Sequence, residues 1–260
     1  MIKLLDLLIE AKEGKKAIVM AGGAGVGKSK FVKQIRSDLE KAGWDELNAD
    51  KYTQDPESDM FNNLGAASRQ IEKIEIPNTI KAGKNFLYDT TATNVDRISG
   101  IKESGYDIMM VMVYTNPIVS FFRNFKRERK VPTVGVLSSW NKAYSNIETY
   151  KKMFGNKFYI IPTELSVDEQ KMVDEFKKAH KENRLKEFFE DLLSSGEFKS
   201  TFRKDPSKEK TPEEIAKSKE LVNKQIDVLS GQFDTIEKQV EQLKTTDMSQ
   251  VVSKAKSFIK

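Results

Sequence analysis

The residues with the clearest capacity for chemistry form one short run, Gly22-Gly23-Ala24-Gly25-Val26-Gly27-Lys28-Ser29. Their types and spacing match G-x-x-x-x-G-K-S/T, a motif whose backbone N–H groups surround a nucleotide phosphate. Glycines let such a loop turn its N–H groups inward and approach an anion closely. Lys28 supplies a mobile positive charge for the β- and γ-phosphates, and the hydroxyl of Ser29 suits Mg²⁺. The alternative, a chance glycine-rich turn, is disfavoured because the whole motif is matched.

The segments on either side of this loop have the patterns that the motif requires. Residues 17–21 form a short apolar run that predicts a buried parallel strand. A helix that begins after the loop would point the positive end of its dipole at a bound phosphate. We therefore expect a strand, a phosphate-binding loop and a helix, and we count Lys30 in the first helical turn among the nucleotide-binding residues. Apolar residues recur after the loop at helical spacing, at Phe31, Val32, Ile35 and Leu39.

Two carboxylates belong to predicted strand ends and are candidates for roles beside the phosphates. Residues 44–50 are predicted to form a second strand that ends at Asp50, and residues 84–91 a third strand that contains Asp89. Because the carboxyl ends of parallel strands face the ligand crevice, both side chains are expected there. Asp50 could orient an acceptor hydroxyl and accept its proton, although a simple turn aspartate is an equal alternative. Asp89 could hold Mg²⁺ or position the acceptor.

A basic segment follows the most apolar predicted strand, residues 107–115. A helix is predicted over residues 120–130, and Arg123 and Arg127 are spaced to share one of its faces. Arginine binds phosphate oxygens at two points and stabilises charge during phosphoryl transfer, so we interpret this segment as a phosphate lid. A solvated basic face and a nucleic-acid backbone contact are the alternatives. The positive charges are those of Arg123, Lys126, Arg127, Arg129 and Lys130.

Other polar and aromatic residues have weaker functional interpretations. In residues 51–82, where helical pieces are plausible around 61–82, Lys51, Arg69 and Lys73 could meet an anionic acceptor, but solvated charges are the default. Trp140 and Tyr144, in a helix predicted over residues 134–154, could stack on a base or sugar, yet their spacing is typical of core residues. Asn94 and Asp96 are interpreted as caps of the next helix.

Composition narrows the class of protein. The chain has 260 residues, 38% of them hydrophobic and 32% charged, with a net charge of +5, a pI of about 9.0 and a mean hydropathy of −0.56. It has no cysteine, which excludes disulfides, thiolate metal sites and cysteine nucleophiles. Its single histidine, His180, lies in a charged stretch and is predicted to be a solvated surface residue. No apolar run is long enough for a transmembrane helix, so we expect no membrane association and a cytoplasmic protein.

The pattern along the chain predicts an α/β fold with a helical extension. A fifth strand is predicted at residues 157–162 and a helix at 166–193, capped by Ser166. We expect a domain over residues 1–195 that opens with a helix at 1–14, a linker at 196–210 and a helical, coiled-coil-like segment at 211–260. This last segment could pack on the body, bind a protein partner or self-associate through residues 211–243. Its apolar residues follow a heptad spacing at Val222, Ile226, Leu229, Phe233, Ile236, Val240 and Leu243.

These features resemble the phosphate-loop (P-loop) kinases that include the polynucleotide 5′-hydroxyl kinases and the zeta-toxin kinases. The resemblance covers roughly residues 15–162 and rests on AGGAGVGKS, LNADKY, YDTTATN and RNFKRERKVP. It implies a three-layer P-loop NTPase fold with a five-stranded parallel sheet. It also implies ATP- and Mg²⁺-dependent transfer of the γ-phosphoryl group to a hydroxyl of a nucleotide, a nucleic-acid end or a sugar.

The resemblance further implies roles for single residues. Asp50 would be the base that activates the acceptor hydroxyl, Arg127 and Arg129 the lid arginines, and Arg123 the base of the lid. Residues 89–93 lack the arginine that zeta-type kinases usually carry after the third strand, which disfavours a nucleotide-sugar acceptor. The region after residue 195 matches neither group.

Two other functions remain open from the sequence. The loop could hold ATP as a structural or regulatory ligand in an interaction module whose C-terminal helix binds a partner. A nucleic-acid-stimulated ATPase is a weaker alternative, because the strand before Asp89 is too short for a convincing Walker B motif.

Overall fold

The structure is a computed structural model that describes residues 14–53, 60, 63–127, 130–194, 211–243 and 246–260. The predicted N-terminal helix, apart from Gly14, and the predicted linker lie outside these residues. No helix in these ranges is both long and apolar enough to cross a membrane.

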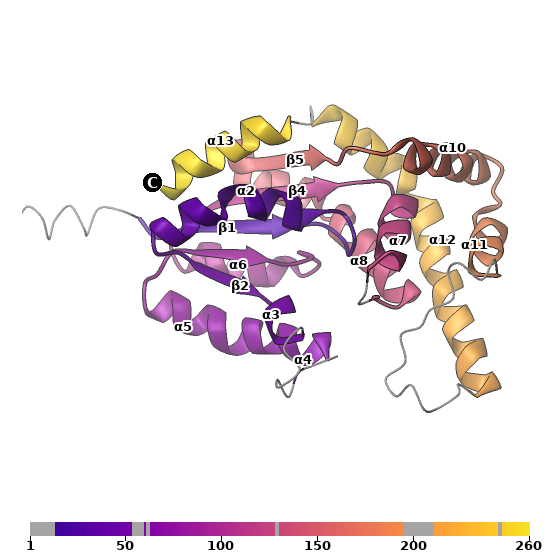
Figure 1. The fold of residues 1–260 in the computed structure, drawn as a ribbon, viewed down its shortest axis with the longest axis horizontal. Helices are drawn as coiled ribbons and strands as arrows, with labels where there is room; N and C mark the ends of the chain where they lie inside the picture. The colour runs from indigo at the N-terminus through magenta and orange to yellow at the C-terminus, as the bar shows by residue number, and fades with distance from the viewer. Residues whose placement is uncertain (1–13, 54–59, 61–62, 128–129, 195–210, 244–245) are drawn as a thin grey trace, which may run out of the picture.

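The centre of the molecule is a five-stranded sheet in which every neighbouring pair is parallel (Figure 1). The strand order is β2-β3-β1-β4-β5, so the strand that leads into the glycine-rich loop lies in the middle. Apolar runs fully buried between helices form parallel strands of this kind. The predicted α/β fold with five parallel strands is confirmed. The strands are β1 (Lys16–Ala21), β2 (Asp45–Asn48), β3 (Phe86–Asp89), β4 (Asp107–Tyr114) and β5 (Phe158–Pro162).

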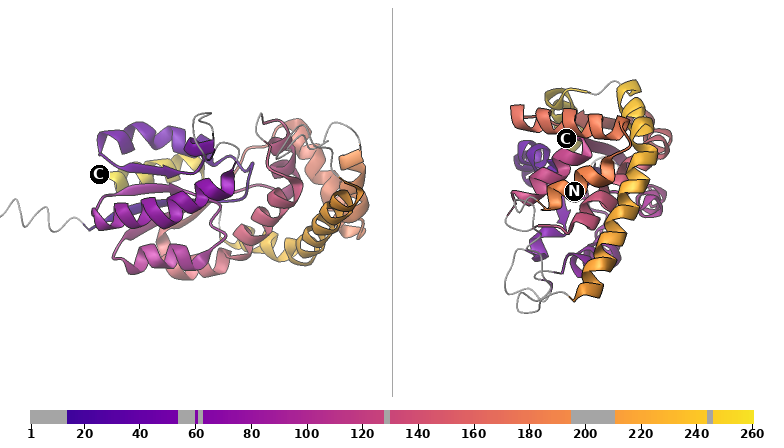
Figure 2. Two further views of the ribbon diagram at one scale, coloured as in Figure 1. Left: turned by 90° about the horizontal axis from the view of Figure 1, so that it is seen from below. Right: turned by 90° about the vertical axis from the view of Figure 1, so that its right-hand side faces the viewer.

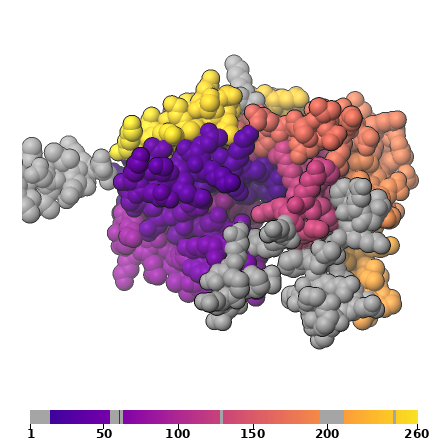
Figure 3. Space-filling view, in the orientation of Figure 1, coloured from indigo at the N-terminus to yellow at the C-terminus, as the bar shows by residue number. Residues whose placement is uncertain are grey.

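Helices cover both faces of the sheet and complete the three layers. On one face, α2 (Lys28–Lys41) lies beside the last helix, α13 (Met248–Ile259), which also contacts β4 and β5 (Figures 1 and 3). The other face carries α6 (Val95–Glu103) and α9 (Ile147–Phe154), as right-handed crossover connections require. The apolar residues of α2 that the helical spacing picked out are buried against the sheet.

A long helical segment connects β2 to β3 and contains a π-helical turn. It consists of α4 (Leu64–Gln70), the π-helix η1 (Ile71–Glu75) and α5 (Ile76–Lys81). The N–H of the first residue of α5 donates to the carbonyl of the first residue of η1, five residues back. Pro77, the next residue, has no N–H for the regular ladder, which explains the local shift in hydrogen bonding.

The second strand ends earlier than the sequence predicts. β2 stops at Asn48, and Asp50 is instead the first residue of a short helix, α3 (Asp50–Thr53). The side-chain oxygen Oδ1 of Asn48 accepts a hydrogen bond from the Asp50 N–H at 2.9 Å, which turns the chain out of the sheet. Asp50 therefore projects from a turn fixed by Asn48.

Two predicted helices are each broken in two. The helix expected over residues 134–154 is α8 (Thr133–Ser145) followed by α9, with Asn146 between them. The helix expected over residues 166–193 is α10 (Val167–Lys181) and then α11 (Leu185–Ser194). In the second break Asn183 has a positive φ of 54°, a conformation that asparagine adopts more readily than most residues.

The C-terminal helix α12 (Pro212–Gln242) packs back on the body of the chain, against α8, α9 and α11 (Figure 2). The ring of Phe233 on α12 stacks on the ring of Trp140 on α8, with the ring centroids 6.3 Å apart and the ring planes at 30° to one another. Trp140 is fully buried and its Nε1 donates to the carbonyl of Thr115, so its predicted core role is confirmed. The heptad residues Val222, Ile226, Leu229, Phe233, Ile236 and Val240 are buried within the chain.

The same packing overturns the prediction for His180. Its side chain is 11% exposed, its Nε2 lies 3.1 Å from Oδ1 of Asp234 on α12, and its ring contacts Phe233 edge-on. The charged residues around His180 in the sequence suggest that its side chain is exposed to solvent, but α12 covers this face of α10.

Candidate active site

A cavity of about 320 Å³ opens at the carboxyl edge of the sheet, where ligands bind in open α/β folds. The glycine-rich loop and the start of α2 form one wall, and the ends of β2 and β3 form the floor. The walls also include α4, η1, α6 and the end of α7 (Pro117–Phe125). Its lining comprises Ala24, Gly25, Val26, Gly27, Lys28, Ser29, Asn48, Ala49, Asp50, Leu64, Ser68, Ile71, Glu72, Tyr88, Asp89, Thr90, Thr91, Thr93, Arg97, Arg123, Arg127 and Val131.

The loop has a conformation that depends on its glycines. Gly22, Gly25 and Gly27 have positive φ angles of 131°, 81° and 98°. A Cβ on Gly22 would lie 2.6 Å from the carbonyl oxygen of Val113, and a Cβ on Gly25 would collide with that of Ser120. Side chains at these positions would force the loop away from β4 and α7.

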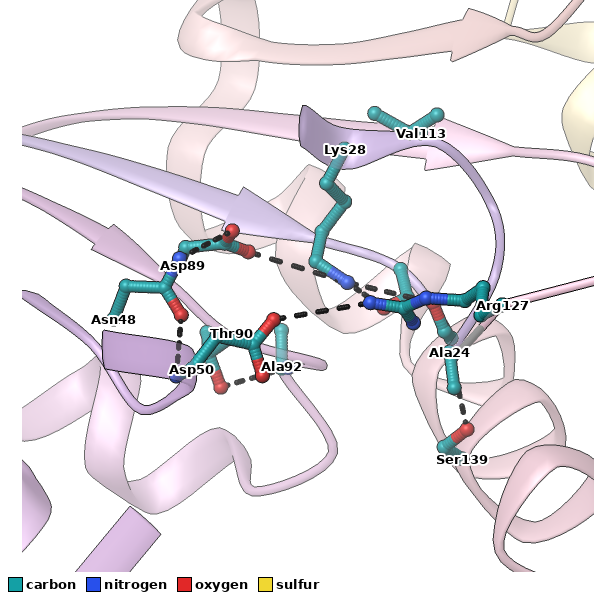
Figure 4. Close-up of polar contacts among 12 residues, drawn as sticks. Ala24, Lys28, Asn48, Asp50, Asp89, Thr90, Ala92, Val113, Arg127 and Ser139 are labelled. Carbon is teal, nitrogen blue, oxygen red and sulfur yellow. Dashed lines mark hydrogen bonds and ion pairs between the residues drawn. The ribbon is translucent and has the colours of Figure 1, made fainter. Parts of the chain in front are cut away.

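Contacts from α7 and α8 hold the loop from behind. The N–H of Ala24 donates to Oγ of Ser139 at 3.1 Å (Figure 4). The hydroxyl of Ser120 donates to the carbonyl of Ala24. A Cβ on Gly23 would lie 3.1 Å from Cα of Trp140. The loop therefore packs against α8, the helix against which α12 also packs.

The start of α2 is suited to an anion. Gly27 precedes the helix without a side-chain cap, and the first turn contains no acidic residue, so neither of these features competes with an anion for the N–H groups of this turn. Lys28 and Ser29 of this turn line the cavity. The side chain of Lys30 turns away, and its Nζ lies 2.6 Å from Oε2 of Glu164. The cradle fits a phosphate, as the sequence predicts, but Lys30 lies outside the cavity lining.

Lys28 spans the loop and the end of β3 (Figure 4). Its Nζ donates to the carbonyls of Gly22 and Gly23 at 3.0 and 3.4 Å, and it lies 4.0 Å from Oδ1 of Asp89. An ammonium held at this point would meet a phosphate seated in the loop.

Asp89 is a buried carboxyl at the end of β3. Burial raises its pKa to about 6, the charge of Asp50 acts in the same direction, and Lys28 partly offsets both. The amide of Asn48 donates to its Oδ2 at 3.4 Å. Asp89 and the hydroxyl of Ser29 line the same cavity and are oxygen donors of the kind that Mg²⁺ uses beside phosphates. In the described ranges no group of three or more His, Cys, Asp and Glu residues could hold a metal by itself.

Asp50 and Arg127 approach one another across the cavity (Figure 4). Nη2 of Arg127 lies 3.9 Å from Oδ2 of Asp50, and both side chains are about one-third exposed. Because α7 ends at Phe125, Arg127 follows the helix and does not share a helical face with Arg123 as predicted. Arg129, the other predicted lid residue, lies outside the described residues.

Arg123 ties α7 to α10 at the edge of the cavity. Its Nε and Nη2 donate to the two carboxylate oxygens of Glu169 at 2.7 and 2.9 Å, and Nη2 also donates to the carbonyl of Glu164. The hydrogen bond from Arg123 lowers the pKa of Glu169. A Cβ on Gly27 would lie 3.7 Å from Nη1 of Arg123, which places this guanidinium beside the phosphate loop.

The sequence did not indicate the far wall of the cavity. There Glu72 of η1 and Arg97 of α6 form an ion pair, and Tyr88 lies beside them. The one feature of this wall that the sequence predicted is the cap of α6. Asn94 caps the helix as expected, and its Oδ1 accepts a hydrogen bond from the N–H of Arg97. This cap sets the first turn of α6, which carries Arg97 to the cavity.

The cations suggested for the acceptor side lie elsewhere. Lys51 pairs with Glu75 at 2.9 Å. Arg69 and Lys73 are absent from the cavity lining among the described residues. Arg97 is thus the cation that the structure brings to this wall.

Comparison with known proteins gives one family. The sequence model of the family described as Zeta toxin matches residues 5–154. None of the curated proteins matches the chain.

Solved structures resemble the chain at low identity. A structure from the PezAT toxin–antitoxin system of Streptococcus pneumoniae has 15% identity and a TM-score of 0.43, over 69% of this chain and 93% of that chain. A gluconokinase from Sinorhizobium meliloti has 15% identity and a TM-score of 0.38, over 59% and 86%. A complex described as AvrRxo1-ORF1:-ORF2 with ATP has 14% identity and a TM-score of 0.47, over 84% and 79%. At these values the likenesses do not bear on the chemistry of the cavity.

Proposed function

The chain belongs to the Zeta toxin family, and we propose that its cavity transfers the γ-phosphoryl group of ATP to an acceptor hydroxyl with Asp50 as the base. The membership makes it a P-loop kinase, an ATP-dependent phosphotransferase. We infer the acceptor and the residues that carry out the transfer from the lining of the cavity. The hydroxyl of a nucleotide, a nucleic-acid end or a sugar would satisfy this chemistry.

The phosphate loop and Lys28 would bind the triphosphate. The N–H groups at the start of α2 face the cavity without a side-chain cap. Lys28 Nζ, which donates to the carbonyls of Gly22 and Gly23, would contact the β- and γ-phosphates. Ser29 and Asp89 would hold Mg²⁺, which when bound supplies charge neutralisation at these phosphates.

We assign to Asp50 the step that activates the acceptor. Its carboxylate would accept the proton of the acceptor hydroxyl as the hydroxyl oxygen bonds to the γ-phosphorus. The bond from that phosphorus to the β–γ bridging oxygen breaks, which leaves ADP and a phosphorylated acceptor. Arg127 lies 3.9 Å from Asp50 and would stabilise the charge on the phosphoryl group in transit. We assign the same role to Arg129.

One observation carries this proposal: Lys28, Asp50, Asp89 and Arg127 come from four separate segments of the chain and line a single cavity. The interaction-module alternative has no such support, because the heptad face of α12 on which it depends is buried against the body.

Phosphoryl transfer from labelled ATP to a panel of hydroxyl compounds tests the proposal. Asp50→Asn should lower the rate of transfer by about 10²–10⁴-fold while ATP still binds, since a general base contributes on that order. Asp96→Asn is the matched control, because Asp96 is exposed in the first turn of α6 and does not line the cavity. Equal transfer by wild type and Asp50→Asn would show that Asp50 is not the base.

A further inference from the structure

The connection that carries Arg127 to the cavity runs from the end of α7, at Phe125, to the start of α8, at Thr133. Lys126 is the C-cap of α7, so Arg127 lies beyond the regular hydrogen-bond ladder of the helix. Arg127 and Val131 of this connection both line the cavity. The position of the guanidinium therefore depends on what holds the two ends of the connection.

The side chain of Asn124 joins these two ends. Its Nδ2 donates to the carbonyl of Val131 at 2.8 Å, and its Oδ1 accepts from the N–H of the same residue at 2.9 Å. Asn124 is fully buried, and the two bonds use both the donor and the acceptor that a side-chain amide offers. The amide thus fixes the last turn of α7 to the residue before Pro132, on either side of Arg127.

The same turn of α7 supports the phosphate loop. A Cβ on Gly25 would lie 2.4 Å from the carbonyl oxygen of Ser120 and 3.4 Å from the backbone nitrogen of Asn124. The loop therefore lies directly against the backbone of the turn from which the Asn124 side chain reaches Val131. Because this contact is made by backbone atoms, a substitution at Asn124 leaves it in place.

The other end of the connection packs on α8. A Cβ on Gly135, in the first turn of α8, would lie 2.9 Å from Cγ1 of Val131. One turn farther along the helix, Oγ of Ser139 accepts from the N–H of Ala24 in the phosphate loop. Both ends of the connection thus rest on helices that hold the phosphate loop, and the Asn124 amide sets Arg127 relative to that loop.

Arg127 meets Asp50 within the cavity (Figure 4). Its Nη2 lies 3.9 Å from Oδ2 of Asp50, whose own turn is fixed by a hydrogen bond to the side chain of Asn48. Each of the two groups assigned to the transfer is therefore held by an asparagine side chain that bonds to backbone. A displacement of about 1 Å in a group that acts on the transition state can lower the rate about 10²-fold.

We propose that Asn124 is a positioning residue for phosphoryl transfer, whose buried amide holds the connection between α7 and α8 so that the guanidinium of Arg127 faces Asp50 in the cavity. The proposal rests on the kinase function proposed above. Asn124 is not part of the cavity lining, so it acts on the reaction through Arg127. A guanidinium held in this way is in position before charge develops on the phosphoryl group, as transition-state stabilisation requires.

A double-mutant cycle with Arg127 tests this role in the full chain, with labelled ATP and a hydroxyl compound that the wild type accepts. Asn124→Ala should lower kcat at least about tenfold. The Kd for ATP with Mg²⁺ should stay within about threefold, because the lost interaction acts on the transition state. In the Arg127→Ala background, Asn124→Ala should lower kcat by less than about threefold, since the group through which it acts is gone.

A near-isosteric variant guards against a loss of folding in Asn124→Ala. Asn124→Asp keeps the size of the side chain and the acceptor for the N–H of Val131 but removes the donor to its carbonyl. Its kcat should fall in the same direction and with the same dependence on Arg127.

Asn141→Ala is the matched control for the loss of a buried amide. Asn141 is also buried, its Nδ2 donates to the carbonyl of Gln225 at 2.9 Å, and it is not part of the cavity lining. Asn141→Ala should lower the melting temperature and change kcat by no more than about twofold. A loss of kcat as large as that of Asn124→Ala would overturn the specific role of Asn124.

Three further results would contradict the proposal or its premise. An equal fold loss of kcat in the wild-type and Arg127→Ala backgrounds would show that Asn124 does not act through Arg127. A lower melting temperature with unchanged kcat in both Asn124 variants would show that the amide is only structural. Either result overturns the positioning role and leaves the kinase function standing. A wild type that transfers phosphate to no hydroxyl compound would instead overturn the kinase function.

Discussion

Nζ of Lys28 lies 4.0 Å from Oδ1 of Asp89, where β1 and β3 end side by side. This contact joins the phosphate loop to the carboxyl that we assign to Mg²⁺, and it partly offsets the burial that raises the pKa of Asp89. The site therefore holds a buried carboxyl that gains a proton more easily than one in water.

The raised pKa of Asp89 predicts a pH dependence of stability in the absence of nucleotide and metal. Protonation of Asp89 favours the folded state, and this contribution is complete below the ordinary value of 3.8. It is lost as the pH rises through about 6. Asp89→Asn cannot ionise, so its thermal stability should gain relative to wild type between about pH 4 and pH 7. A constant difference in melting temperature across this range would contradict the raised pKa.

Substitution of glycine by alanine should have opposite effects on stability at Gly25 and at Gly231. Gly25 has a φ of 81°, and a Cβ there would collide with the carbonyl of Ser120, so Gly25→Ala should destabilise the fold and weaken ATP binding. Gly231 lies within α12, where a Cβ would meet nothing within 4 Å, so Gly231→Ala should stabilise the fold by up to about 1 kcal/mol. Denaturant unfolding of both variants measures the contrast, and a stable Gly25→Ala with normal ATP affinity would refute the role of the loop geometry.

Helix α12 should stabilise the phosphate loop through α8. Phe233 stacks on Trp140, and Trp140 lies against Gly23 of the loop. Phe233→Ala should lower the free energy of unfolding by about 3–5 kcal/mol and weaken ATP binding in the protein that remains folded. Val228→Ala on the same helix, where the side chain is 44% exposed, should change it by no more than about 0.5 kcal/mol. Similar effects of the two substitutions in chemical denaturation would show that α12 is a dispensable appendage.

Local sequence patterns predicted the parts of the fold that depend on near neighbours. The strand of residues 107–115 and the cap at Ser166 are predicted correctly because burial and capping leave short-range signatures. The helix breaks at Asn146 and Asn183 were missed because neither contains the glycine or proline that usually marks an end.

Local sequence patterns could not predict the contacts between distant segments of the chain. Glu72 and Arg97 are 25 residues apart, and only the topology of the sheet brings η1 and α6 to the same cavity. His180 was assigned to the surface because its own helix is charged, yet Phe233 and Asp234 of α12 cover it. The phosphate loop is the exception, since its motif specifies the strand, turn and helix together.

Calorimetric titration of ATP in the presence of Mg²⁺ into wild type and Lys28→Ala tests the central claim most directly. We expect saturable binding to wild type and a loss of affinity of about 10- to 100-fold in Lys28→Ala, as removal of a charged hydrogen bond produces. Lys30→Ala should bind as wild type does, because Lys30 pairs with Glu164 away from the cavity. Absence of binding to wild type, or equal affinity in Lys28→Ala, would contradict the account.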